Sequence, residues 1–121
     1  MNVTVNRSSV AAGDDAIPHD EVVEVAPDVP LSKVVADLLA RYYLATIVGG
    51  QATWILESDR PLAVVAQQWQ RPRYLVDPDL PISSFEVDGR GVSLMFRYWL
   101  QNDPDHVFDE LAAGRRPPRR P

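Results

Sequence analysis

A short acidic segment near the N-terminus contains the residue types that bind divalent cations. Asp14, Asp15, His19 and Asp20 offer carboxylate oxygens and an imidazole within seven residues, which are suitable ligands if the loop folds around an ion. The spacing matches neither an EF-hand nor the His-Glu-x-x-His arrangement of zinc enzymes. We therefore expect a solvated loop here, with no bound metal and no cofactor.

A second cluster could perform acid–base chemistry. It consists of Asp103, Asp105, His106, Asp109 and Glu110. His106 has the neighbouring carboxylates that orient a general base. A proline follows Asp103, however, and acidic residues favour the first turn of a helix, where they cap free amides and meet the positive end of the dipole. We expect capping to explain these acids.

Other catalytic patterns are weaker. Asp77 and Asp79 form a carboxylate pair, but the proline between them indicates a turn. The serines lie in no nucleophile elbow, and Gly49 and Gly50 are not followed by the Lys and Ser/Thr of a phosphate-binding loop. The sequence therefore favours a protein without catalytic residues.

Aromatic and arginine side chains alternate in two segments. The residues that we expect to contact a partner are Trp69, Arg71, Arg73, Tyr74, Arg97 and Trp99. Such side chains stack on nucleic-acid bases or anchor protein interfaces. Seventeen acidic residues against twelve basic ones make nucleic acid an unfavourable partner. We predict a protein interface, and the alternative is ordinary packing at the edge of a core.

The basic charge is concentrated at the C-terminus. Four of the twelve basic residues lie in the last seven positions, among three prolines. A segment of this composition cannot build a core, so we expect residues 114–121 to be a flexible extended tail. The remaining chain is strongly acidic, which favours a basic partner.

Hydrophobic periodicity predicts the elements that position these residues. Alternation indicates strands at residues 2–6 and 21–26, followed by a helix over residues 32–46 with Ser32 as its cap. Two hairpins are expected, with arms at residues 52–58 and 62–69, and at 84–87 and 92–99. The arm that begins at residue 62 is apolar on both faces, so it needs a cover on each side. A second helix over residues 104–113 ends at Gly114.

This order of elements predicts an α+β fold. We expect a small antiparallel or mixed sheet of about five strands, one main helix packed across it and a short C-terminal helix. A strand pair followed by a helix and further strands loosely resembles the element order of a β-grasp. We divide the chain into an N-terminal strand and acidic loop (residues 1–20), either paired with the sheet or loosely attached, a single domain (21–113) and the tail (114–121).

Composition restricts the class of protein. The absence of cysteine excludes disulfide scaffolds, thiolate zinc sites and cysteine nucleophiles. The longest uncharged run, residues 42–56, contains two glycines and is too short to span a bilayer. The N-terminus lacks the apolar stretch of a secretory signal, so we expect a cytoplasmic protein without membrane contact. Eleven arginines against one lysine are typical of a GC-rich bacterial genome.

We therefore hypothesise a non-catalytic protein-binding module of the bacterial cytoplasm, such as an immunity or accessory protein for a basic partner. Self-association through a sheet edge is compatible with this hypothesis. The alternative is a small enzyme or ligand-binding protein with a cleft of carboxylates and His106 or His19.

Overall fold

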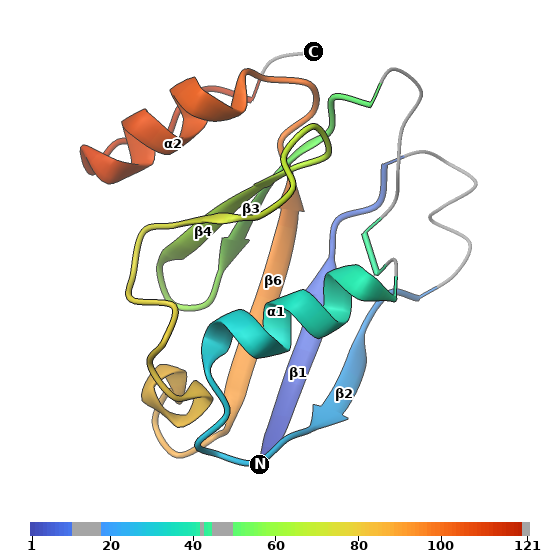
Figure 1. Ribbon diagram of the computed structural model, residues 1–121, viewed down its shortest axis with the longest axis vertical. Helices are drawn as coiled ribbons and strands as arrows, with labels where there is room; N and C mark the ends of the chain where they lie inside the picture. The colour runs from blue at the N-terminus through green and yellow to red at the C-terminus, as the bar shows by residue number, and fades with distance from the viewer. Residues whose placement is uncertain (11–17, 42, 45–49, 120–121) are drawn as a thin grey trace.

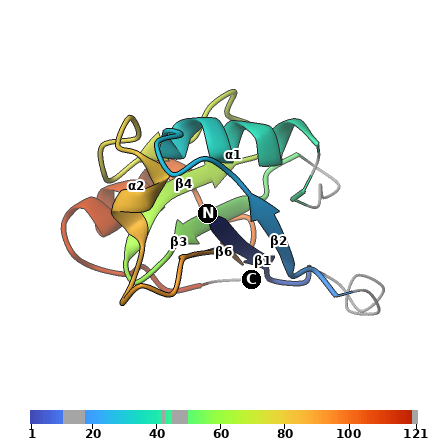
Figure 2. The same ribbon diagram turned by 90° about the horizontal axis from the view of Figure 1, so that it is seen from below.

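The computed structural model describes residues 1–10, 18–41, 43–44 and 50–119. In these residues a six-stranded sheet carries one helix across one face and a second helix on the other (Figures 1 and 2). The strands are β1 (Asn2–Arg7), β2 (Glu21–Glu24), β3 (Thr53–Glu57), β4 (Pro61–Ala66), β5 (Arg73–Tyr74) and β6 (Val92–Tyr98). The helices are α1 (Leu31–Ala40), the short 3-10 helix η2 (Ile82–Phe85) and α2 (Pro104–Ala112).

The sheet is mixed. Its strand order is β2-β1-β6-β3-β4-β5, with β1 parallel to β6 and all other neighbours antiparallel. The predicted α+β class is confirmed. A sixth strand appears because Arg73 and Tyr74 pair with Val64 and Ala63 at the edge of the sheet. The N-terminal strand β1 pairs with β2 on one side and with β6 on the other.

Helix α1 packs its apolar side on one face of the sheet. Leu31, Val34, Val35 and Leu38 are buried there, as the 3.6-residue periodicity predicts. The expected cap at Ser32 is wrong, because the helix begins at Leu31 and has no side-chain cap. Backbone carbonyls from the segment after β5 replace it and accept the amides of the first turn.

Helix α1 also ends earlier than predicted. Its last residue is Ala40, and the amide of Tyr43 donates to the carbonyl of Leu38, 3.2 Å away. This i to i−5 hydrogen bond interrupts the i to i−4 ladder, so the helix does not continue. Gly49, which follows the predicted end of the helix, lies outside the described residues.

The two faces of β4 are covered by the two helices. The larger core lies between the sheet and α1 and includes Trp54, Leu56 and Phe96. A smaller cluster on the opposite face joins Ile55 and Val64 to Val107 of α2. Helix α2 is therefore the second cover that the apolar sequence of β4 requires.

One predicted strand is wrong. Residues 84–87 do not form a hairpin arm, because residues 82–85 form η2. The amides of Ile82 and Ser83 donate to the carbonyls of Val29 and Pro27, so this segment bonds to the chain that leads into α1. Turn residues and an apolar neighbour cannot distinguish this arrangement from a hairpin, because the partner carbonyls are distant in sequence.

The C-terminal segment returns along α2. The cap at Asp103 is confirmed, since its carboxylate accepts the amide of Asp105 at 3.1 Å. Gly114 follows the helix with φ of 81°, and Pro117 is buried. None of the helices in the described ranges is long and apolar enough to cross a membrane.

Candidate partner-binding groove

The six predicted contact residues are divided between the two faces of the sheet. Consecutive strand residues point to opposite faces, so Arg73 faces α2 whereas Tyr74 faces α1. Arg71 joins Tyr74 in a groove on the α1 side. Trp69, Arg73, Arg97 and Trp99 lie on the α2 side. The six residues therefore do not form one continuous surface in the folded protein.

Arg73 anchors α2 to the sheet. Its guanidinium carbon lies 4.0 Å from the centre of the Phe108 ring and 5.7 Å from that of Trp69. Its Nη1 also lies 3.1 Å from a carboxylate oxygen of Asp105. These are cation–π contacts, in which the guanidinium lies over the face of each ring. Arg73 and Trp69 therefore take part in packing α2 against the sheet.

Arg97 and Trp99 take part in a second internal cluster. Glu57 is only 8% exposed and accepts hydrogen bonds from Arg97 and, at 2.5 Å, from Arg116 of the tail. The guanidinium of Arg116 also lies 5.4 Å from the centre of the Trp99 ring. Burial raises the pKa of Glu57, but the two arginines outweigh it and hold that pKa below its ordinary value.

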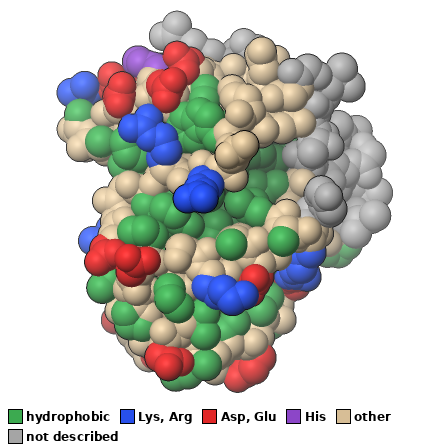
Figure 3. Space-filling view, in the orientation of Figure 1, with side chains coloured by type: hydrophobic (Ala, Val, Ile, Leu, Met, Phe, Trp, Pro, Cys, Tyr) green, Lys and Arg blue, Asp and Glu red, His purple; other side chains and the backbone are tan. Residues whose placement is uncertain are grey.

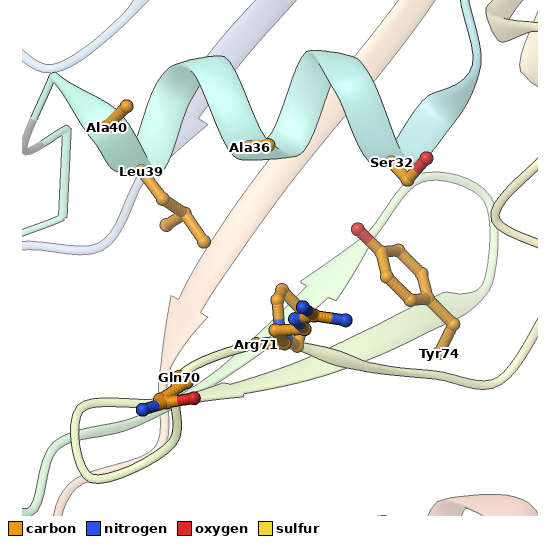
Figure 4. Close-up of a pocket in the computed structure, with 8 residues that line it drawn as sticks. Ser32, Ala36, Leu39, Ala40, Gln70, Arg71 and Tyr74 are labelled. Carbon is orange, nitrogen blue, oxygen red and sulfur yellow. The ribbon is translucent and has the colours of Figure 1, made fainter.

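The groove lies between α1 and the segment that leads into β5, and its volume is about 630 Å³. It is lined by Ser32, Ala36, Leu39, Ala40, Gln70, Arg71, Pro72 and Tyr74. In Figure 4, Leu39 points from α1 towards the floor of the groove, and the hydroxyl of Tyr74 points towards Ser32. The Arg71 guanidinium lies below the helix and is directed towards the Tyr74 ring (Figure 4).

The groove contains a few polar groups, of which Tyr74 and Arg71 are the most important. Tyr74 is half-buried, and this burial raises its pKa to about 12, so its hydroxyl is a hydrogen-bond donor at neutral pH. Arg71 is exposed and has no ion pair within the part of the chain that the structure describes. None of the lining residues within the described ranges is acidic. It therefore combines a free guanidinium with an apolar wall.

Figure 3 shows the face that carries α1. Hydrophobic side chains are visible between separate charged groups, with basic groups near the middle of the face and most acidic groups towards its rim. An apolar surface with a few charges is typical of the centre of a protein interface.

The described members of the acidic and histidine clusters do not line the groove. Asp103 serves as a helix cap, and His106 lines a different hollow of about 390 Å³ beside the tail prolines. The Asp77 carboxylate accepts the amide of Asp79, as expected for a turn. Within the described ranges, three or more histidine or acidic side chains nowhere gather around a metal-sized space. Asp14 and Asp15 lie outside those ranges.

Sequence reasoning missed most of the groove lining. Ser32 was interpreted as a cap, and Ala36, Leu39 and Ala40 were not singled out. The available signal was the pair of alanines four residues apart on α1, since small side chains at this spacing leave one side of a helix open. Glu57 was also missed, although a carboxylate at the end of a strand that is buried along its whole length requires a partner.

Comparisons with protein-family models, with curated proteins and with solved structures find no significant match for this chain.

Proposed function

We propose that this protein is a non-catalytic protein-binding module whose contact surface is the groove between α1 and residues 70–74. One observation supports this proposal above the others. An apolar groove containing an unpaired arginine, Arg71, opens beside β5, which lies at the end of the strand order. Edge strands offer main-chain groups to another chain, and the groove offers pockets for that chain's side chains.

The contacts of the other predicted residues support the same choice. Trp69, Arg73, Arg97 and Trp99 already contact side chains of this protein. Arg71 and Tyr74 are left with open space beside them. The lining residues that the structure describes include no acidic or histidine side chain, and these are the side chains that most often act as general acids and bases.

The overall charge of the partner is a further part of the proposal. The chain carries a net charge of −5, so long-range electrostatics favour the approach of a partner with a basic surface. An acidic protein with a basic target fits the proposal of an immunity or accessory protein of the bacterial cytoplasm. Cell fractionation and identification of the neighbouring genes test the location and the biological context.

A second candidate function is the binding of a small molecule in the same groove. Its volume of about 630 Å³ lies within the range of small-molecule sites. The edge strand β5 lies beside the groove, and an edge strand suits an extended peptide chain better than a small molecule. We therefore place the protein partner first.

Site-specific photo-cross-linking tests the proposal. A photoreactive benzoylphenylalanine replaces the groove residue Ala36, and a control carries it at Ser93, an exposed position of β6 on the opposite face. After irradiation in an extract of the source organism, we expect one cross-linked protein from the Ala36 position only. The purified partner should then bind the unmodified chain in a 1:1 complex.

A matched pair of variants completes the experiment. Ala36→Gln narrows the groove without adding charge, and Ala112→Gln makes the same change at an exposed position of α2. We expect the first variant to weaken the complex at least about fivefold and the second to leave it unchanged. Equal cross-linking at both positions, or equal binding by both variants, would contradict the proposal.

A further inference from the structure

The described lining of the groove carries one formal charge, and this charge is positive. Among the described residues, Arg71 is the only charged one in the lining, although the whole molecule has a net charge of −5. Lys33 neighbours the lining residue Ser32, but its ammonium is paired with Asp37 at 2.9 and 3.1 Å. Neither Lys33 nor Asp37 therefore changes the sign of the charge in the groove.

The other polar groups of the lining include three hydrogen-bond donors. The raised pKa of Tyr74 keeps its hydroxyl protonated, Ser32 provides a second hydroxyl and Gln70 an amide. Figure 4 shows Ser32 above Tyr74, and Arg71 between Tyr74 and Gln70. Hydroxyl, amide and guanidinium donors with a positive charge complement an anion, and a guanidinium binds a carboxylate with two parallel hydrogen bonds.

The rest of the lining is apolar. Ala36, Leu39 and Ala40 form the helix side of the groove, and Pro72 lies in the segment opposite. A ligand that fits both parts needs an acidic group attached to an apolar body. A peptide provides this combination when an acidic residue has aliphatic neighbours.

We infer that the groove binds an acidic peptide segment of the partner, with a side-chain carboxylate on Arg71 and an adjacent aliphatic side chain against Leu39 and Pro72. This inference rests on the proposed function and specifies the chemistry of the partner at the same site. A side-chain carboxylate fits better than a chain terminus, because terminal carboxylates are captured by nests of backbone amides, whereas the donors here are side chains.

The local requirement is compatible with a partner that is basic overall. The attraction between Arg71 and a carboxylate acts over a few ångströms, while the net charges govern approach from a distance. The partner then presents an isolated acidic residue within a more basic surface.

Peptide titration monitored by amide chemical shifts tests the inference on the full chain. The probe is acetyl-Ala-Leu-Glu-Leu-Ala-amide, and its control replaces Glu with Gln. We expect shifts at residues 32–40 and 70–74, with the Glu peptide binding at least about fivefold more tightly at low ionic strength. That preference should decrease as ionic strength rises from about 0.02 M to about 0.3 M.

Arg71→Gln should abolish the preference for the Glu peptide. Because the Arg71 side chain is exposed and unpaired in the described structure, its replacement should leave the fold intact. Arg60→Gln makes the same change of charge at an exposed arginine in the turn between β3 and β4, and it should retain the preference. Tyr74→Phe should reduce the affinity for the Glu peptide by about two- to threefold through loss of one donor.

Three outcomes would overturn the inference. Equal binding of the Glu and Gln peptides shows apolar recognition without a carboxylate. If Arg71→Gln still prefers the Glu peptide, the carboxylate binds elsewhere. Tighter binding of an uncapped Ala-Leu-Leu peptide, with a free C-terminus, assigns the groove to a chain terminus.

The two proposals can fail separately. If the Ala36 cross-link identifies a partner but the Glu peptide shows no preference, the protein-binding function stands and its acidic chemistry is wrong. If neither a cross-link nor peptide-induced shifts occur, both are wrong.

Discussion

Arg116, four residues beyond the end of α2, donates a hydrogen bond to Glu57 in β3 at 2.5 Å. The same arginine lies over the ring of Trp99, and Arg97 approaches the other oxygen of the carboxylate. The C-terminal segment is thus joined to the sheet by a buried carboxylate that has two cationic partners. This contact lies on the face opposite the groove and stabilises the fold.

Glu57→Gln should destabilise the protein by about 2 kcal/mol, because the two arginines lose their common negative partner. The guanidinium ends are half-exposed, which limits the loss. Urea unfolding of the variant and the parent at neutral pH measures the difference. Glu86→Gln, at an exposed carboxylate without an ion pair in the described residues, is the control and should change stability by less than about 0.5 kcal/mol.

The contribution of Glu57 should depend on pH. Its pKa is lower in the folded protein than its ordinary value of 4.5, so the folded state binds this proton less readily than the unfolded state. The stabilisation is complete above pH 4.5 and is lost as the pH falls through the lowered pKa. Unfolding curves of the parent and Glu57→Gln should therefore converge in acid, and a constant difference below pH 4.5 would contradict this account.

Gly91→Ala should be more destabilising than Gly89→Ala. Both glycines have positive φ, 82° and 68°, so alanine is strained at each position. A Cβ at Gly91 would lie 2.9 Å from the carbonyl oxygen of Asn2, whereas at Gly89 its nearest neighbour is 3.9 Å away. We expect losses of about 3 and about 1 kcal/mol, respectively, in thermal unfolding. Equal losses would show that β1 and the turn can separate without cost.

Ionisation of Tyr74 should lower stability in alkali. Burial raises its pKa from 10.0 to about 12, so the unfolded state loses this proton first. The stability of the folded state is fully retained below pH 10 and decreases as the pH rises towards 12. Tyr74→Phe should lack this component, and its near-ultraviolet titration should lack one tyrosine that ionises near pH 12. Parallel stability profiles for the two proteins from pH 10 to 12 would show that Tyr74 is not buried in solution.

The sequence singled out only two of the residues that line the groove. Arg71 and Tyr74 were identified from their alternation with other aromatic and basic residues, and both line the groove. Trp69 and Arg73 share the same local pattern, yet they pack on α2. The difference arises because β5 places successive side chains on opposite faces, and only the tertiary structure shows which face a helix leaves open.

The ends of the helices likewise include some that the sequence predicted and some that it did not. The cap at Asp103 was predictable because its acceptor and donor are two residues apart. The start of α1 was not, since its first amides donate to carbonyls of Pro78 and Leu80. For the same reason η2 was expected to be a strand, because its amides bond to a segment more than fifty residues away.

Hydrophobic periodicity, glycine and proline positions and net charge by themselves determined the α+β class, most strands, the existence of both helices and the acidic character of the chain. These properties follow from interactions between residues close in sequence or from composition. The tertiary structure alone decided that β1 lies beside β6, that Glu57 meets the tail and that Arg71 faces an open groove. Each of these three arrangements depends on contacts between segments that are far apart in the sequence. Such contacts form only when the core packs, so local sequence patterns do not predict them.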